Sequence, residues 1–502
     1  MTRAVVIGSG FGGLALAVRL QSAGIATTLV EARDKPGGRA YVYEDEGFTF
    51  DAGPTVITDP DCLKELFALS GRSIDDYVSL VPVSPFYQLR WEDGDVFNYV
   101  NDQEELDRQI AARKPKDVAG YKRFLAYSEE LYVEGYEKLG AVPFLDFKSM
   151  VKVAPQLMRL QSYRSLHAKV ASFIEDEHLR QAFSFHTLLV GGNPFATSAI
   201  YGLIHALERR GGVWFAMGGT GALVKGLVRL FEDLGGTVRL SAPVAKITTN
   251  GDRATGVRLQ SGETIEADLV ASNADVVHTY KALLGETARG QAEARRLTKK
   301  RFSNSLFVIY FGLDQPVPNG MEHHVILFGP RYRELIADIF KGPDLPDDFS
   351  LYLHAPSKTD SSLAPPGQSA YYVLAPVPHL GAANIDWATE GPKYRDRIFD
   401  YLEEKAIPRL KDTLVTSRIF TPADFETELN AHMGSAFSLE PILTQSAYFR
   451  AHNRDDDIEN LYLVGAGTHP GAGLPGVVGS AKATASLIVD EVGAQPMAAA
   501  SA

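Results

Sequence analysis

Apolar and polar positions follow a strand–helix–strand pattern at the start of the chain. An apolar run at residues 5–7 leads into the glycine-rich segment at residues 8–13, and a helical pattern occupies residues 14–20. A second apolar run at residues 27–30 ends on Glu31. This order predicts two parallel strands joined by a helix, with glycines at the first corner and a carboxylate after the second strand.

The first corner has the spacing Gly8-x-Gly10-x-x-Gly13, which is typical of dinucleotide-binding proteins. The glycines permit a tight turn and a close approach of the backbone to a pyrophosphate, which the helix N-terminus attracts. Glycine makes up 45 of the 502 residues, so the spacing alone is a weak signal. The alternative is a turn that only packs the helix. Glu31 lies 18 residues after Gly13, where it could accept hydrogen bonds from a ribose, and this favours a ligand.

The pattern changes character several times along the rest of the chain. Alternation over residues 86–99 predicts a hairpin, residues 103–210 are mainly helical, and residues 211–285 return to an α/β pattern. A buried-type strand at residues 461–464 leads into a second glycine-rich corner at 465–479, before a predicted helix at 480–489. That corner could present backbone N–H groups to a flavin ring, or it could be a loop that needs glycines to turn.

Composition narrows the possible functions. The net charge of −12 argues against a general nucleic-acid binder. Cys62 is the only cysteine, which excludes a disulfide framework and a multi-thiolate metal site. No apolar stretch reaches the length of a membrane span, and no signal peptide is expected, so we expect a cytoplasmic protein.

His186, His205, His323, His324 and His469 show no metal-ligand spacing with carboxylates. The adjacent pair His323 and His324 should point to opposite faces if it lies on a strand. We therefore expect no metal.

One segment reverses the acidic character of the chain. Residues 147–174 contain no Asp or Glu, but they contain Lys148, Lys152 and Arg159 among apolar residues. Basic, apolar segments of this kind lie on anionic lipid surfaces, so this segment predicts membrane contact through these three residues. The alternative is an ordinary surface helix that pairs with acids elsewhere.

Several motifs together resemble one known family. They are Gly8-x-Gly10-x-x-Gly13, Glu31, Gly37-Gly38-Arg39-Ala40, Asp51-Ala52-Gly53-Pro54-Thr55 and Gly465-Ala466-Gly467-Thr468-His469-Pro470-Gly471-Ala472-Gly473. In this combination the chain resembles the bacterial and fungal-type carotenoid phytoene desaturases, which are FAD enzymes of the flavin amine oxidase superfamily. The resemblance extends to about residue 492, and the last motif is its most specific part.

The resemblance implies FAD as cofactor and assigns residues to it. Glu31 would hold the adenosine ribose, Arg39 would approach the pyrophosphate, and Val244 would meet the adenine. Residues 475–478 would lie at the isoalloxazine. The full set of implied cofactor-binding residues is Gly8, Gly10, Phe11, Gly12, Gly13, Glu31, Arg33, Gly38, Arg39, Gly53, Pro54, Thr55, Val244, Gly465, Gly467, Pro475, Gly476, Val477 and Val478.

The implied fold is α/β (α+β overall). It has a Rossmann-like FAD-binding domain that is discontinuous in sequence, an inserted sheet-plus-helix substrate domain and a helical membrane-facing region. The expected boundaries are 1–75, 211–285 and 431–492 for the FAD-binding domain, 76–130 and 286–430 for the substrate domain, 131–210 for the helical region, and 493–502 for a disordered tail.

The implied reaction is the stepwise desaturation of phytoene, toward lycopene or neurosporene, by hydride transfer to the flavin and loss of a proton. Oxygen or a quinone would reoxidise the flavin. No acid stands within residues 147–153, where the family places one, and the nearest is Asp146. Lys152 is the candidate for a catalytic cation there, with a solvated lysine as the alternative.

Other functions remain open at this point. A carotenoid isomerase, a saturase or a desaturase of C30 chains would share these motifs, and pocket length would distinguish them. A non-catalytic prenyl-lipid-binding protein of the same fold need not hold flavin, and both intact glycine corners argue against it. A simple NAD enzyme would not need the second corner.

Overall fold

A five-stranded parallel sheet is built from stretches that lie far apart in the sequence. The computed structural model describes residues 2–494. In spatial order the strands are β19 (Leu461–Leu463), β13 (Leu269–Ser272), β1 (Arg3–Ile7), β2 (Ala26–Val30) and β9 (Thr237–Arg239). The predicted strand–helix–strand unit is confirmed, because β1 and β2 pair in parallel on either side of α1 (Phe11–Ser22). This parallel strand–helix–strand unit also confirms the Rossmann-like fold class.

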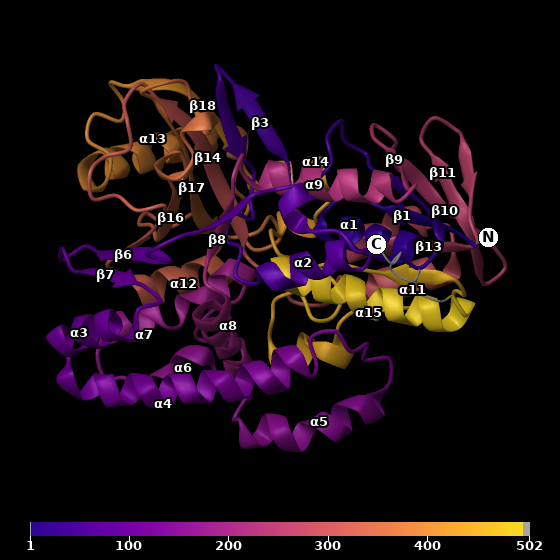
Figure 1. Ribbon diagram of the computed structural model, residues 1–502, viewed down its shortest axis with the longest axis horizontal. Helices are drawn as coiled ribbons and strands as arrows, with labels where there is room; N and C mark the ends of the chain where they lie inside the picture. Colours follow the sequence, from indigo (N-terminus) through magenta and orange to yellow (C-terminus); the bar gives the residue numbers. More distant parts are fainter. Residues whose placement is uncertain (1, 495–502) are drawn as a thin grey trace.

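Helices from both ends of the chain cover this sheet. The helix α1 packs against α9 (Thr220–Asp233) and against α15 (Leu474–Val492), so the last helix lies beside the first (Figure 1). The almost fully buried α1 is apolar over most of its surface, as expected of a helix enclosed by protein, and its one charged residue, Arg19, pairs with Glu65. A small antiparallel sheet of β10 (Val244–Asn250), β11 (Arg253–Leu259) and β12 (Thr264–Glu266) lies at this end of the molecule.

The helix α15 begins earlier than the sequence pattern predicts. The expected start was residue 480, but the helix starts at Leu474. Its N-cap, Gly473, has a φ of +94°, which ends the loop, and Pro475 lies in the first turn, where its missing N–H costs nothing. The six additional residues bring the helix N-terminus to the glycine-rich corner.

A second, seven-stranded sheet stands next to the first unit (Figure 1). Its order is β18 (Leu414–Phe420), β14 (Ser305–Leu313), β17 (Ser369–Val377), β16 (Leu351–His354), β15 (His324–Phe328), β6 (Tyr87–Trp91) and β7 (Val96–Tyr99). The predicted hairpin is confirmed as β6–β7, and β15 joins it in parallel. One face of the sheet packs on α13 (Trp387–Lys405), and the other face belongs to an aromatic-rich core.

Residues 103–211 are mainly helical, as predicted. They form α3 (Gln103–Arg113), α4 (Pro115–Leu131), α5 (Phe147–Arg159), α6 (Leu166–Val170), α7 (Glu177–Ala182) and α8 (Leu203–Gly211). The helix α5 lies at the lower edge of Figure 1, and none of its residues is buried. Among the described residues no helix is both long and apolar enough to cross a membrane. From residue 495 onward, the tail expected to be disordered lies outside the described residues.

Candidate active site

Steric contacts require glycine at the first corner. A Cβ at Gly13 would lie 2.0 Å from the Gly8 carbonyl oxygen, and Gly8 itself has a φ of +90°. A side chain at either position would therefore move α1 away from β1 or strain the turn. The corner leaves the N-terminus of α1 open toward a cavity, and Gly8, Gly10, Phe11 and Gly12 line that cavity.

Glu31 is buried at the end of β2 and lines the same cavity. One carboxylate oxygen, Oε2, accepts hydrogen bonds from the Ser9 N–H at 2.8 Å and the Ser9 hydroxyl at 2.6 Å. The other oxygen accepts one hydrogen bond, from the Arg33 N–H at 3.0 Å. A carboxylate oxygen can accept two hydrogen bonds, so Oε1 can still accept one from a ligand hydroxyl.

Arg39 has the environment of a cation that lacks its counter-ion. It lines the cavity, its Nη2 donates to the Ser435 carbonyl at 3.3 Å, and its buried Nε has no partner among residues 2–494. No carboxylate lies within ion-pair distance of it in that range. Desolvation lowers the pKa of the guanidinium, and the Asp275 carboxylate opposes this only in part. An anionic ligand next to a helix N-terminus would complete this environment.

The second glycine corner reaches the same cavity through α15. Pro475, Gly476 and Val477, in the first turn of the helix, line the cavity. Gly465 and Gly467 do not line it, because they pack behind it. A Cβ at Gly465 would lie 2.4 Å from the Asn273 side chain, and one at Gly467 would lie 2.3 Å from Val276.

Most of the expected cofactor-binding residues meet in one cavity of about 620 Å³. Besides those named above, Arg33, Gly38, Gly53, Pro54, Thr55 and Val244 line it. Gly13, Gly465, Gly467 and Val478 do not line it, and their positions indicate packing around the cavity. Val478 is buried in the core beside α1.

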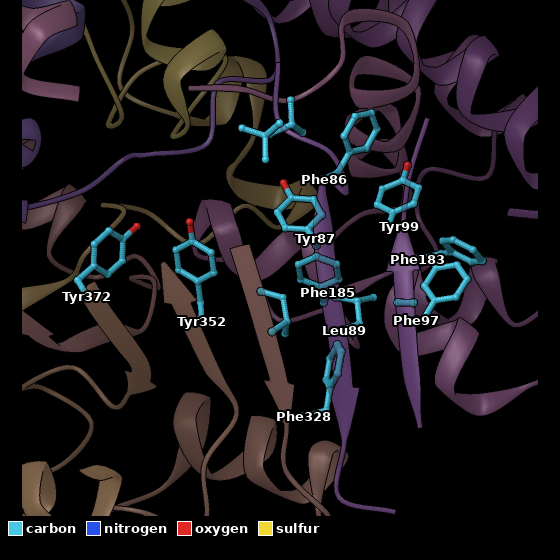
Figure 2. Close-up of a cluster of buried hydrophobic side chains, with 14 of the residues drawn as sticks. Phe86, Tyr87, Leu89, Phe97, Tyr99, Phe183, Phe185, Phe328, Tyr352 and Tyr372 are labelled. Atoms are coloured by element: carbon cyan, nitrogen blue, oxygen red, sulfur yellow. The ribbon is translucent and has the colours of Figure 1, made fainter. Parts of the chain in front are cut away.

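The cavity continues into an aromatic region that sequence reasoning missed. Phe185, Phe328, Tyr352 and Tyr372 line it there, and Figure 2 shows Tyr352 and Tyr372 side by side on neighbouring strands. The apolar strand patterns at residues 351–353 and 371–374 were visible in the sequence. Which of these side chains face the cavity depends on strand order and register, which the sequence pattern does not give.

The expectation that His323 and His324 point to opposite faces does not apply, because it required both residues to lie on a strand. Ring nitrogens of His323, His324 and His354 lie within 4.8 Å of one another, and all three residues are buried. His323 lies just before β15, outside the regular strand, so alternation does not apply to it. Burial lowers the pKa of each imidazole, to about 3 for His323, which keeps the rings neutral. The absence of a metal stays an expectation.

The helix α5 lies between the cavity and the solvent. Met150, Val153 and Leu157 line the cavity, whereas Lys148 and Lys152 are exposed. Lys152 does not line the cavity, so its position does not support a catalytic role. Arg159 is also exposed, and it pairs with Glu130 at 2.7 Å.

Comparison with known proteins agrees with this geometry. A family model of flavin-containing amine oxidoreductases matches residues 11–489, which defines the class as a flavin-dependent oxidoreductase. The chain is 66% identical over 97% of its length to a lycopene-forming phytoene desaturase of Paracoccus sp. strain N81106, 97% of which is covered. It is 63% identical over 98% of its length to the lycopene-forming phytoene desaturase of Pantoea ananas, all of which is covered. The chain therefore belongs to the phytoene desaturases within the flavin-containing amine oxidoreductase family, and the resemblance seen in the sequence is confirmed.

A solved structure shows the same fold at low sequence identity. Cyclohexylamine oxidase from Brevibacterium oxydans IH-35A superposes with a TM-score of 0.62 at 17% identity. The match covers 98% of this chain and 99% of that protein.

Proposed function

We propose that the protein binds FAD and desaturates phytoene stepwise to lycopene. The observation that carries the proposal is that one cavity joins the two glycine corners to an aromatic, apolar region. A dinucleotide and a long hydrocarbon can meet in such a cavity with their reacting atoms in contact. The names of the 63–66% identical relatives support the same substrate and product.

The residues present fit FAD. Arg39 and the N-terminus of α1 suit the pyrophosphate, the free acceptor on Glu31 suits a ribose hydroxyl, and the first turn of α15 suits the flavin ring. When bound, the flavin supplies the two-electron acceptor that a saturated hydrocarbon carbon requires.

The chain's own residues orient the polyene and keep water out. Phe185, Phe328 and Leu374 line the apolar end of the cavity. Hydride loss from an allylic carbon leaves a cation on the substrate, and water would capture it. An apolar wall therefore protects the cation until the neighbouring carbon loses its proton.

The test uses purified protein, FAD and liposomes loaded with phytoene, with products separated by chromatography. We expect a yellow protein with a flavin spectrum that converts colourless phytoene to lycopene. A yellow protein that returns phytoene unchanged under oxidising conditions would contradict the substrate assignment. A colourless protein that binds phytoene would instead indicate a non-catalytic lipid carrier.

We also propose that α5 lies on an anionic lipid surface and admits the substrate. Phe147, Val151 and Met158 are each more than half exposed, an unusual state for large apolar side chains. Lys148 and Lys152 stand among them without an ion pair within the described residues. Because α5 also lines the cavity, a hydrocarbon dissolved in the bilayer would enter beneath this helix without crossing water.

Sedimentation with vesicles that contain phosphatidylglycerol tests the membrane proposal. Replacement of Lys148, Lys152 and Arg159 by Glu should greatly reduce the fraction of protein that sediments. Replacement of Lys225, Arg258 and Lys393, which are exposed elsewhere, makes the same change in net charge and should leave sedimentation unchanged. Equal sedimentation of both triple variants would rule out α5 as the contact.

Reoxidation of the flavin requires an acceptor, for which we propose oxygen or a membrane quinone. The two are separated by running the liposome assay under nitrogen with and without a quinone. If product formation stops after one turnover per flavin without quinone but continues with quinone, the quinone is the electron acceptor.

A further inference from the structure

Three hydroxyls and an imidazole form a hydrogen-bonded chain at the wall of the cavity. The Thr55 hydroxyl lies 2.6 Å from the Tyr372 hydroxyl and 3.0 Å from the Tyr352 hydroxyl. The Tyr352 hydroxyl lies 2.7 Å from Nδ1 of His324. Thr55, Tyr352 and Tyr372 line the cavity, and Thr55 directly follows Gly53 and Pro54, which we expect beside the cofactor.

The count of donors and acceptors gives this chain a direction. If Tyr372 donates to Thr55, Thr55 to Tyr352 and Tyr352 to His324, every hydroxyl proton has an acceptor. In the opposite direction the Tyr372 proton would have no acceptor among the described residues. The chain therefore points away from the cavity and ends on a lone pair of His324, a neutral imidazole.

Beyond His324 the polar path continues toward solvent. Nε2 of His324 and Nδ1 of His354 are buried without a partner among the described residues. Nε2 of His354 lies 2.9 Å from Nε2 of His323, and Nδ1 of His323 lies 2.6 Å from the hydroxyl of Thr359. Thr359 is partly exposed. One gap, between His324 and His354, separates two hydrogen-bonded segments, and one ring nitrogen of each of these residues lies within 4.8 Å of the other.

We propose that Tyr352 is the residue that accepts the proton lost in each desaturation step, with His324 behind it as the proton-holding positioning residue. This proposal rests on the proposed function, because that reaction must release one proton per double bond into an apolar cavity. The path through His354, His323 and Thr359 returns the proton to solvent before the next step.

The step balances without any further reactant. The substrate cation loses a proton from the carbon next to the cationic centre, and the electrons of that C–H bond form the new double bond. The proton binds to Tyr352 Oη as the tyrosine's own proton passes to Nδ1 of His324. The imidazolium then loses the proton on Nε2 toward His354, which leaves Tyr352 and His324 neutral with the His324 proton on Nδ1. His324 must return to the tautomer protonated on Nε2 before the next step. A weak base suffices, since a proton next to a carbocation is strongly acidic.

Glu208 is the rival acceptor near the apolar part of the cavity. Its side chain has no exposed surface, and Tyr87 donates a hydrogen bond to it at 2.7 Å. Its other oxygen lies 2.9 Å from Nε2 of His186. Glu208 also lines the cavity, but its two oxygens are engaged by Tyr87 and His186, whereas Tyr352 has a hydroxyl chain that leads away from the cavity.

A pair of Tyr→Phe variants tests the proposal in flavin-loaded protein with phytoene liposomes. Tyr352→Phe should lower kcat on the order of 100-fold, the usual contribution of a proton-transfer group, while KM and bound flavin are unchanged. Tyr371→Phe is the control, because Tyr371 neighbours Tyr372 on β17 but packs in the core on the opposite face of the sheet. It should retain the wild-type rate.

An isotope effect separates proton transfer from a general packing defect. With phytoene deuterated at the carbon that loses the proton, Tyr352→Phe should show a larger isotope effect on product formation than the wild type and Tyr371→Phe. His324→Gln, which keeps a polar side chain but cannot hold the proton, should show the same increase.

Two results would overturn the proposal. One is a rate for Tyr352→Phe and His324→Gln equal to that of Tyr371→Phe. The other is a slow variant whose isotope effect equals that of the wild type. A wild-type protein that leaves phytoene unchanged would contradict the proposed function instead, so the two failures are distinguishable.

Discussion

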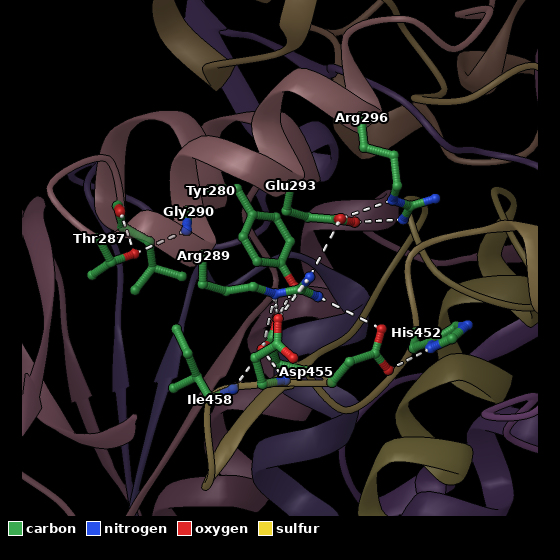
Figure 3. A network of polar contacts seen from close by, with 12 residues as sticks. Tyr280, Thr287, Arg289, Gly290, Glu293, Arg296, His452, Asp455 and Ile458 are labelled. Atoms are coloured by element: carbon green, nitrogen blue, oxygen red, sulfur yellow. Dashed lines mark hydrogen bonds and ion pairs between the residues drawn. The ribbon is translucent and has the colours of Figure 1, made fainter. Parts of the chain in front are cut away.

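Two partly buried arginines stand in opposite electrostatic environments. Arg289 on α11 (Ala288–Leu297) lies among carboxylates, with its Nε 3.1 Å from Asp455 and its Nη1 3.2 Å from Asp457 (Figure 3). Arg39, at the cavity, has no carboxylate within ion-pair distance among the described residues and keeps a buried N–H without a partner. Burial would lower the pKa of both guanidiniums. For Arg289 desolvation is the largest single effect, but Asp455, Tyr280 and Glu293 together outweigh it and raise the pKa, whereas for Arg39 the pKa stays lowered.

This difference separates a structural ion cluster from a binding site. The side chain of Asp455 is fully buried and also accepts hydrogen bonds from Tyr280 and from the backbone of Ile458. The protein therefore satisfies this charge from within, and the cluster ties α11 to the segment before β19. The cation at Arg39 has no counter-charge among the described residues, and the pyrophosphate of the proposed FAD would supply one.

Loss of Arg289 should have the largest effect on stability. Arg289→Met leaves Asp455 buried without its cation, which costs about 3–5 kcal/mol of unfolding free energy for a buried ion pair. Thermal unfolding of the flavin-loaded protein should therefore begin at a much lower temperature. Arg295→Met, an exposed change on the same helix, should leave the unfolding temperature unchanged. Equal unfolding temperatures for the two variants would show that the cluster contributes little.

Loss of Arg39 should have the opposite effect to loss of Arg289: it should weaken FAD binding and change the stability of the fold little. Arg39→Met removes a charge-assisted contact of about 1.5–3 kcal/mol, so FAD affinity should fall about 10- to 100-fold in a fluorescence titration of apoprotein. The apoprotein should unfold at the same temperature as the wild type or slightly higher, because a desolvated charge has been removed. Arg39→Lys keeps the charge and should lie between the two. Unchanged FAD affinity in Arg39→Met would remove the contrast with Arg289.

The sequence predicted the first of these environments poorly and the second well. Arg39 follows two glycines in a motif that the sequence already marks, so its position at the cavity could be predicted from its neighbours in the chain. Arg289 and Asp455 are 166 positions apart, and no local pattern indicates that they meet. The same limit applies to Tyr352 and His324, which belong to ordinary apolar strands until the register of β15 and β16 brings them together.

The predictions of secondary structure were likewise right where local sequence determines the structure. Glycine turns, the β6–β7 hairpin and the helical stretch were predictable because local sequence determines them. The start of α15 was predicted six residues too late, because the glycine and proline residues before Ser480 read as loop. There Gly473 ends the loop and Pro475 occupies the first helical turn.

The smallest expected effect concerns a buried carboxyl without a cation, which can be compared with Asp455. Asp51, like Asp455, is buried, but its partners are the backbone N–H groups of Thr220 at 2.8 Å and Gly221 at 3.1 Å, at the start of α9. Desolvation raises its pKa to about 6, although these two hydrogen bonds oppose the shift. Asp51 thus lacks the cation that Asp455 has.

The sign of the resulting pH dependence follows from that shift. A carboxyl whose pKa is raised on folding adds stability below its unfolded pKa, and this stability is lost as the pH rises through about 6. Acidification from pH 7 to pH 5 should therefore stabilise the wild type by about 1 kcal/mol relative to Asp51→Asn, since one pKa unit corresponds to about 1.4 kcal/mol. Denaturant unfolding of both proteins at the two pH values measures this difference. Because the two proteins share every other titrating group, the contributions of those groups cancel in the comparison. A stability difference independent of pH would mean that Asp51 stays ionised. The N-terminus of α9 would then stabilise the charge of Asp51 as well as Arg289 stabilises the charge of Asp455.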